Sequence, residues 1–442
     1  MVARLFLTLV ALAAAPLAAQ DAATGAASMA ETPALDTAAV EVAAPAAISQ
    51  GAVSPALGLA EWKFLRDQAA GAGPDLLPAV ISRLDLFILE YPQLREAADA
   101  QWLLAKLSQR AGDDASAMAA LARILHEHPG SSRALEAQTL FLELAREALS
   151  RRLRDAAQSL AYPPQKAKST EEERMAGLVV ALGRSPAAAF FSKPGLELAR
   201  RFRARFPDYQ GMPAVIEAEA RLDEAAKRYP AAELSYREIA DIFPDSRQGP
   251  GAFLGIARIL SRPHSWFWRL FHGNAFHQNC AKAIGSLEDL LKKYPEQKNM
   301  ALAALTREAD IFRRWLSQYR SAVAVDSKIA DLFPGSPESL DALKSAADIA
   351  HDKLKDYALE IRLRRRVADG YPAPEAPEQL LKIAKVEKEN LGDQTKAMEA
   401  CEEVADKFPQ TKFARQARRM LRKFASAKPA AAAPSGAGKG SP

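Results

Sequence analysis

The sequence contains little of what most catalytic or disulfide-stabilised proteins need. Two cysteines, Cys280 and Cys401, occur among 442 residues, so a disulfide framework is excluded and both are expected to be buried thiols. Among six histidines, only His272 and His277 lie close to a cysteine, in the pattern H-x4-H-x2-C before Cys280. That spacing fits a zinc site poorly and offers no fourth ligand. We therefore expect no metal and no cofactor.

Motifs of the common enzyme classes are missing as well. The sequence has no G-x-S-x-G, H-E-x-x-H, P-loop or G-x-G-x-x-G. Its carboxylate runs, such as Glu171 to Glu173 and Glu402-Glu403, are typical of solvated helix faces. We predict that the protein is not an enzyme.

Long apolar runs are limited to the N-terminus. Residues 5–15 form a short apolar core after Arg4, and Leu17-Ala18-Ala19 is a plausible cleavage site. The run is shorter than the roughly 20 residues that span a bilayer, so residues 1–19 are predicted to be a secretory signal peptide. An uncleaved anchor is the alternative. We expect a periplasmic or otherwise exported protein without a transmembrane span. No cysteine follows the core, so a lipoprotein anchor is not expected.

Composition divides the remainder of the chain. Residues 20–60 are rich in Ala, Pro and Thr and have few bulky groups, which predicts a disordered spacer. Residues 61–424 are predicted to be folded, and the Ala/Pro/Gly/Lys tail 425–442 to be disordered.

A recurring aromatic–proline or His–proline pair organises the predicted folded part. The intervals between successive prolines are 37, 34, 44, 37, 51, 39, 38 and 37 residues. Internal repeats of this length predict a repeat architecture. The pairs are Tyr91-Pro92, His128-Pro129, Tyr162-Pro163, Phe206-Pro207, Phe243-Pro244, Tyr294-Pro295, Phe333-Pro334, Tyr371-Pro372 and Phe408-Pro409.

Alignment on these prolines places similar residues at fixed offsets. Offsets of −12, −8 and −5 share one face of a helix. Small residues stand at −12, in Ala117, Ala232, Ala283, Ala322 and Ala397. Mostly large residues stand at −8, in Leu121, Tyr236, Leu287 and Cys401, with Asp326 as an exception. Aliphatic residues stand at −5, in Ile124, Ile239, Leu290, Ile329 and Val404. Alanine returns at +8, in Ala100, Ala137, Ala252, Ala303, Ala342 and Ala417. Small residues at these points predict closely packed helices.

The residues around each proline predict where helices stop and start. Proline disfavours the helical conformation in the residue before it, so a helix ends there. Ser131, Ser246, Ser336 and Thr411, two residues after their prolines, are predicted N-caps of the next helices. A second, polar turn, such as Leu391-Gly392-Asp393-Gln394, divides each unit. Each unit is thus predicted to be a helical hairpin that buries its apolar face only by stacking.

These features resemble the tetratricopeptide repeat, over residues 62–424. The pattern F-P-x-S-x-x-A-x-x-A is similar to the longer-period repeats of exported bacterial envelope proteins. Those include the outer-membrane β-barrel assembly lipoproteins and the Tol–Pal-associated cell-division coordinators. The resemblance implies an all-α fold, a right-handed α-solenoid of helix–turn–helix repeats. It also implies a scaffold that binds protein partners of the cell envelope. The alternative is a cell-wall-associated module that binds peptidoglycan or supports a wall hydrolase. The lipoprotein cysteine and the coordinators' coiled-coil heptads are both absent.

The 51-residue interval contains an aromatic insertion, residues 261–276. Insertions in solenoids map to one face, often the binding face. We predict partner contact through Trp266, Phe267, Trp268, Arg269 and Phe271. An extra turn packed onto the stack, and contact with a membrane surface, are the alternatives.

The 44-residue interval, between Pro163 and Pro207, is predicted to be a degenerate repeat. Thr170 and Glu173 begin a capping-box helix that runs through Leu182, before a loop that includes residues 190–195.

The formal net charge is +5, and basic runs occur at residues 200–203, 362–366 and 415–423. Export argues against nucleic acid as the ligand. Acidic partner proteins or anionic envelope polymers fit this charge better, and a solvated helix face remains the plainer interpretation.

Overall fold

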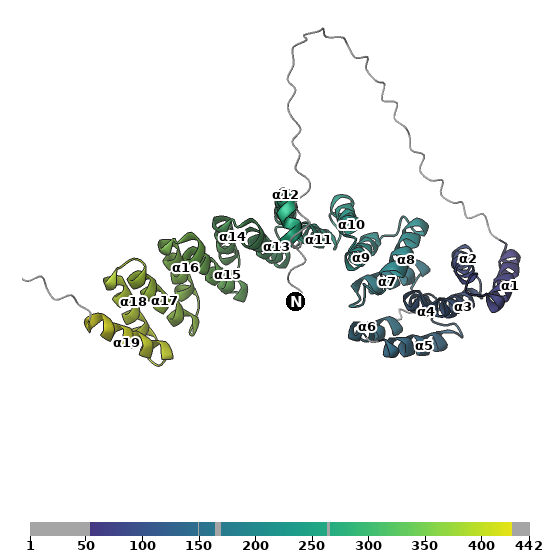
Figure 1. Cartoon of the computed structure of the whole chain (residues 1–442), viewed down its shortest axis with the longest axis horizontal. Helices are drawn as coiled ribbons and strands as arrows, with labels where there is room; N and C mark the ends of the chain where they lie inside the picture. The colour runs from purple at the N-terminus through teal and green to yellow at the C-terminus, as the bar shows by residue number, and fades with distance from the viewer. Residues whose placement is uncertain (1–53, 149, 164–168, 263–265, 427–442) are drawn as a thin grey trace, which may run out of the picture. The chain divides into compact units, whose positions relative to one another are not determined.

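A computed structural model describes residues 54–148, 150–163, 169–262 and 266–426. Side chains of residues 266–272 lie outside this description. Every regular element in these ranges is helical, and successive helices form hairpins (Figure 1). The all-α solenoid of stacked hairpins is confirmed. The elements are α1 (Pro55–Gly71), α2 (Leu77–Glu90), α3 (Ala97–Arg110), α4 (Asp114–Glu127), α5 (Ala134–Glu147), α6 (Arg151–Ala161), α7 (Glu171–Arg184), α8 (Ser192–Arg205), α9 (Met212–Ala225), α10 (Tyr229–Ile242), α11 (Gly249–Leu260), α12 (Trp266–Lys293), α13 (Lys298–Asp310), η1 (Ile311–Leu316), α14 (Tyr319–Leu332), α15 (Pro337–Ile349), η2 (Ala350–Leu354), α16 (Tyr357–Gly370), α17 (Glu375–Glu389), α18 (Gln394–Lys407) and α19 (Lys412–Ser426).

The residues at the fixed offsets form the core of the hairpins. All the named residues at −12, −8 and −5 are buried. The alanines at +8 are buried too, with one exception. Ala303 is exposed, whereas Ala301 and Ala304 are buried. The prediction for Ala303 was wrong because the apolar face of α13 runs through Ala304, Leu305 and Glu308 instead.

The predicted N-caps are correct in two of the four repeats. The Ser336 hydroxyl accepts a hydrogen bond from Ser339 N, and the Thr411 hydroxyl accepts one from Ala414 N. Ser131 and Ser246 are not caps, because a turn delays the start of α5 and α11. Each of these two serines donates its backbone N–H to the carbonyl of the residue before proline.

The capping box before α7 is confirmed, with reciprocal bonds between Thr170 and Glu173. The helix continues to Arg184, two residues beyond the predicted end. The loop predicted over residues 190–195 is shorter, because α8 begins at Ser192.

The helical region also differs slightly from its predicted limits. α1 begins at Pro55, ahead of residue 61, because Gly58 packs on the Tyr91 ring and a methyl group at Gly58 would lie 2.5 Å from that ring. α19 extends to Ser426.

Two of the predicted polar turns have an added feature. α13 and α15 continue into the π-helices η1 and η2 before the chain turns. Ser317 and Lys355 then take the left-handed conformation, with φ of 53° and 55°. The sequence analysis predicted the turns but not the π-helices.

Each helix packs mainly on its neighbours in the chain, as stacked hairpins require, but α4 is an exception. It contacts α3 and α5 and also α6, α7 and α8. Figure 1 shows α5 and α6 on one side of α4, and α7 and α8 on the other. Consequently every residue from Ala117 to Glu127 is buried, including Arg123 and His126.

The two cysteines are free and buried, as expected. Burial raises the pKa of each thiol to about 11, so both stay protonated and unreactive near neutral pH. No helix in the described ranges combines the length and the apolar character needed to cross a membrane.

Candidate functional site

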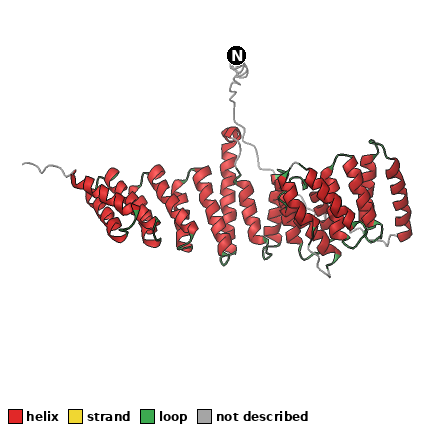
Figure 2. Ribbon diagram, turned by 90° about the horizontal axis from the view of Figure 1, so that it is seen from below, coloured by secondary structure: helices red, strands yellow, loops and turns green. Residues whose placement is uncertain are grey.

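The insertion lengthens one helix. α12 has 28 residues, whereas α4, α10, α14 and α18 each have 14. At 1.5 Å per residue, α12 is about 42 Å long and its hairpin partner α11, with 12 residues, about 18 Å. The N-terminal part of α12 therefore extends beyond α11, and the long helix stands above its neighbours in Figure 2.

The predicted contact residues belong to this extension. The backbone of Trp266, Phe267, Trp268, Arg269 and Phe271 is helical. Their side chains lie outside the described residues, so partner contact through them stays a prediction.

Phe276, the last aromatic residue of the insertion, follows the structural alternative. It is 2% exposed and packs edge-to-face on Trp315, with ring centroids 5.8 Å apart. The described part of α12 thus rejoins the stack at Phe276.

The weak metal motif does not form a site where it is described. His277 is exposed and Cys280 is fully buried, so they lie on different sides of α12. His272 lies outside the described side chains. Among the described residues, no three His, Cys, Asp or Glu side chains gather as metal ligands would.

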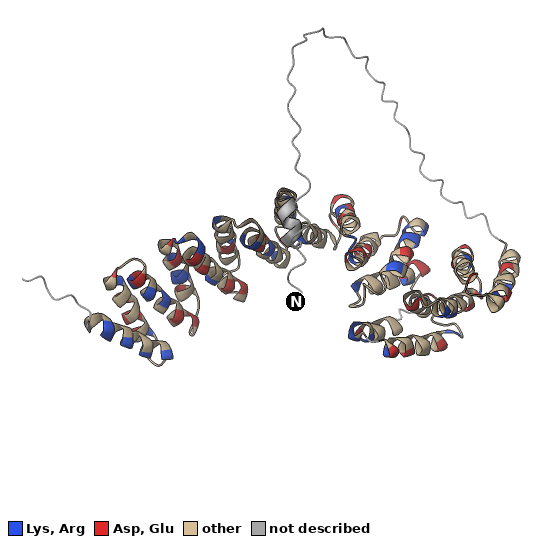
Figure 3. Cartoon of the chain, viewed as in Figure 1, with Lys and Arg blue, Asp and Glu red and all other residues tan. Residues whose placement is uncertain are grey.

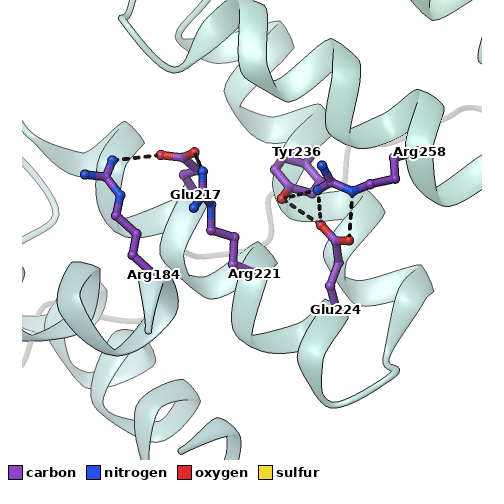
Figure 4. Close-up of polar contacts among 6 residues, drawn as sticks. All are labelled: Arg184, Glu217, Arg221, Glu224, Tyr236 and Arg258. Atoms are coloured by element: carbon purple, nitrogen blue, oxygen red, sulfur yellow. Dashed lines mark hydrogen bonds and ion pairs between the residues drawn. The ribbon is translucent and has the colours of Figure 1, made fainter. Parts of the chain in front are cut away.

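Charged side chains of α9 connect three hairpins (Figure 4). Glu217 accepts hydrogen bonds from Arg184 of α7, at 3.2 Å, and from Arg221, at 2.6 Å. One helical turn or more further on, Glu224 accepts from Arg258 of α11 at 2.5 and 3.1 Å. These pairs hold the surface charges of neighbouring repeats in register.

Tyr236 of α10 completes the second pair. Its hydroxyl donates to Glu224 at 2.8 Å and accepts from Arg258 at 3.1 Å. Burial, reinforced by the charge of Glu224, raises the pKa of Tyr236. Although burial alone would lower the pKa of Arg258, the hydrogen bond to Glu224 raises it. None of the three groups changes charge near neutral pH, so this network is suited to holding helices rather than to proton transfer.

Two of the three basic runs are used in the same way. Arg201 and Arg203 of α8 pair with Asp85, Glu219 and other acidic groups. Arg364 of α16 is buried among Glu360, Asp348 and Gln379, at 2.7 to 2.9 Å. These arginines are therefore part of the fold, and their sequence clustering is no sign of a ligand.

The third run, in α19, remains open to solvent. The helix has six basic and no acidic residues, and it appears blue without red in Figure 3. Four of its arginines are exposed and form no ion pair with any described residue: Arg415, Arg418, Arg419 and Arg422. The extension of α12 and this basic face of α19 are the two candidate contact surfaces.

Comparison with known proteins supports the repeat assignment. A family model for the tetratricopeptide repeat matches residues 99–131 and 380–411, which include α4 and α18 with most of their partner helices. No curated protein matches the sequence. Among solved structures, the crystal structure of the P58(IPK) TPR domain is similar at 11% identity, with a TM-score of 0.20, over 84% of this chain and 98% of that one. The repeat type predicted from the sequence is confirmed at this level, while the envelope type stays a prediction.

Proposed function

We propose that this chain is an exported, non-enzymatic scaffold that binds protein partners in cell-envelope assembly or division. The matched repeats support protein binding, because tetratricopeptide repeats build extended surfaces from stacked helical hairpins. The N-terminal 19 residues support export, through a basic residue, a short apolar core and small residues at a cleavage site.

One observation carries the proposal, namely the length of α12. The added residues lengthen a helix instead of forming a loop, and this helix outlasts its hairpin partner by about 24 Å. The added turns contain the sequence W-F-W-R-L-F. Tryptophan and arginine are the residues that most often dominate binding energy at protein interfaces. A rigid helix that presents them lowers the entropic cost of docking.

Cross-linking in envelope extracts tests this function. The tagged full-length protein should retain specific envelope proteins, and the double variant Trp266→Ala, Trp268→Ala should lose them. Phe64→Ala is the matched control, because Phe64 is a 60% exposed aromatic on the distant helix α1. Equal retention by all three proteins, or no retained protein at all, would contradict the proposal. Sequencing the N-terminus of the protein from a periplasmic fraction tests export separately.

The basic face of α19 favours a second candidate, a module that binds an anionic polymer of the cell wall. Four exposed arginines on one terminal helix suit a repeating anion better than a single acidic side chain. The protein should co-sediment with purified sacculi, and Arg418→Gln with Arg422→Gln should weaken this binding. Lys63→Gln with Arg66→Gln removes the same charge from α1 and serves as the control. Sedimentation that ignores both pairs would eliminate this candidate.

A further inference from the structure

The irregular packing of α4 leaves a polar cavity of about 490 Å³ beside it. Its walls come from the turn before α3, the turn after α4, the start of α7 and the end of α8. Three connections between repeats thus meet here because α7 and α8 pack directly on α4. The volume lies within the range of small-molecule sites.

The lining carries a surplus of two positive charges. Four arginines and two glutamates face the cavity. Arg123 pairs with Glu127 at 2.9 Å, and Arg205 pairs with Glu171 at 2.9 Å. Arg123 also faces Asp85, which is itself paired with Arg201 at 2.7 Å outside this lining.

The remaining two arginines, Arg95 and Arg174, are not neutralised. Arg95 is exposed and forms no ion pair with the described part of the chain. Arg174 donates only to the carbonyl of Ser169, at 2.6 Å. Burial lowers the pKa of His128, which lines the same cavity, so its imidazole is neutral at pH 7. The local charge is therefore close to +2.

Three buried polar atoms of the lining have no hydrogen-bond partner in the protein. They are Oε1 of Gln101, Oγ of Ser131 and Nε of Arg174. Gln101 is fully buried, and its amide nitrogen donates to Glu127 at 2.7 Å, which fixes Oε1 as a free acceptor. Buried polar atoms normally have partners, so their concentration around one cavity points to a ligand with both acceptors and donors.

We propose that this cavity binds a small hydroxylated phosphomonoester. A phosphate ester carries close to two negative charges at pH 7 and several acceptor oxygens, which matches Arg95, Arg174 and the Ser131 hydroxyl. Guanidinium groups fit phosphate oxygens in bidentate geometry. The acceptor of Gln101 matches a ligand hydroxyl. Inorganic phosphate alone would leave most of 490 Å³ unfilled. This site does not depend on the proposed scaffold function.

Titration calorimetry of the full-length chain tests the site, with glucose 6-phosphate, glucose and inorganic phosphate as probes. Glucose 6-phosphate should bind more tightly than inorganic phosphate, and glucose should not bind. Arg95→Gln should weaken binding about tenfold, since it removes a charge-assisted contact. Arg415→Gln, an equal loss of charge on α19, should leave binding unchanged.

Ser131→Ala separates binding from folding. The hydroxyl has no protein partner, so its removal should leave the midpoint of unfolding unchanged or raise it, while ligand affinity falls. No binding of the ester by the wild-type chain, or equal binding by wild type and Arg95→Gln, would overturn the proposal. Equal affinity for the ester and for inorganic phosphate would mean an adventitious ion only, and would overturn it as well.

Discussion

Substitution of Gly183 tests how closely α7 and α9 pack. Gly183 is buried in α7, and a methyl group added there would lie 2.7 Å from the Cα, Cβ and carbonyl oxygen of Ala218. Ordinary contacts of this kind begin near 3.4 Å. Since two of the three atoms belong to the backbone of α9, no side chain can rotate away. The helices would have to separate by several tenths of an ångström.

Gly177 provides the matched control in the same helix. It is exposed, and a methyl group there would meet nothing within 4 Å. Both substitutions gain the helix propensity of alanine over glycine, about 1 kcal/mol. Only Gly183→Ala adds the overpacking cost, about 1–3 kcal/mol. The difference between the two variants therefore isolates the steric cost.

Urea unfolding followed by circular dichroism measures this difference. We expect Gly177→Ala to raise the midpoint and Gly183→Ala to lower it. Because repeat arrays can unfold in parts, hydrogen exchange should localise the loss to α7 and α9. The hydrogen bond from Arg184 to Glu217, beside the contact, should open with it. Equal midpoints for the two alanine variants would refute the close approach of these helices.

Other predictions concern buried charges and a helix cap. Burial raises the pKa of Asp326 to about 6, despite Arg313 at 3.2 Å. Stability from its protonated form is complete below about pH 4 and lost as pH rises through 6, so Asp326→Asn should flatten the dependence of the unfolding free energy on pH from 4 to 7. Arg364→Ala should cost about 3–5 kcal/mol because it leaves a buried carboxylate unpaired, whereas Arg362→Ala, an exposed neighbour, should change stability by less than about 0.5 kcal/mol. Thr170→Ala should cost about 1 kcal/mol through loss of the α7 cap, measured by urea unfolding.

Sequence spacing predicted the hairpins because it reports core packing directly. Residues such as Ala232, Tyr236 and Ile239 share one helix face, and all are buried. Asp326 broke this pattern at −8, and the reason required coordinates. Its partner Arg313 comes from η1, on the preceding helix, and no local pattern in the sequence pairs the two.

The π-helices left a trace in the spacing that the sequence analysis did not use. η1 and η2 lie in the repeats with proline intervals of 39 and 38 residues. The repeat of α17 and α18 has an interval of 37 residues and no π-helix. A π-helical bond encloses one more residue than an α-helical bond. The surplus residues are therefore absorbed inside the first helix of the hairpin, before the turn.

Helix starts were harder to predict, since serine after proline serves two purposes. In Ser336 the next residue is proline, which favours the first helical position, and the serine caps the helix. In Ser131 and Ser246 no proline follows, and the chain forms a further turn before the helix begins. The distinguishing signal was the residue after the serine.

The packing of α4 changes how stability is distributed along the chain. In a regular solenoid each repeat contacts only its neighbours, so stability is a sum of local terms. Here α4 contacts α7 and α8 across the intervening hairpin of α5 and α6. Asp85 of α2 reinforces this coupling through Arg201 of α8. The hairpins from α2 to α8 must therefore unfold more cooperatively than the repeats from α13 onward, where contacts follow chain order. A helix surrounded on all sides must also bury its polar residues, which explains why Arg123, His126 and Glu127 are buried in α4.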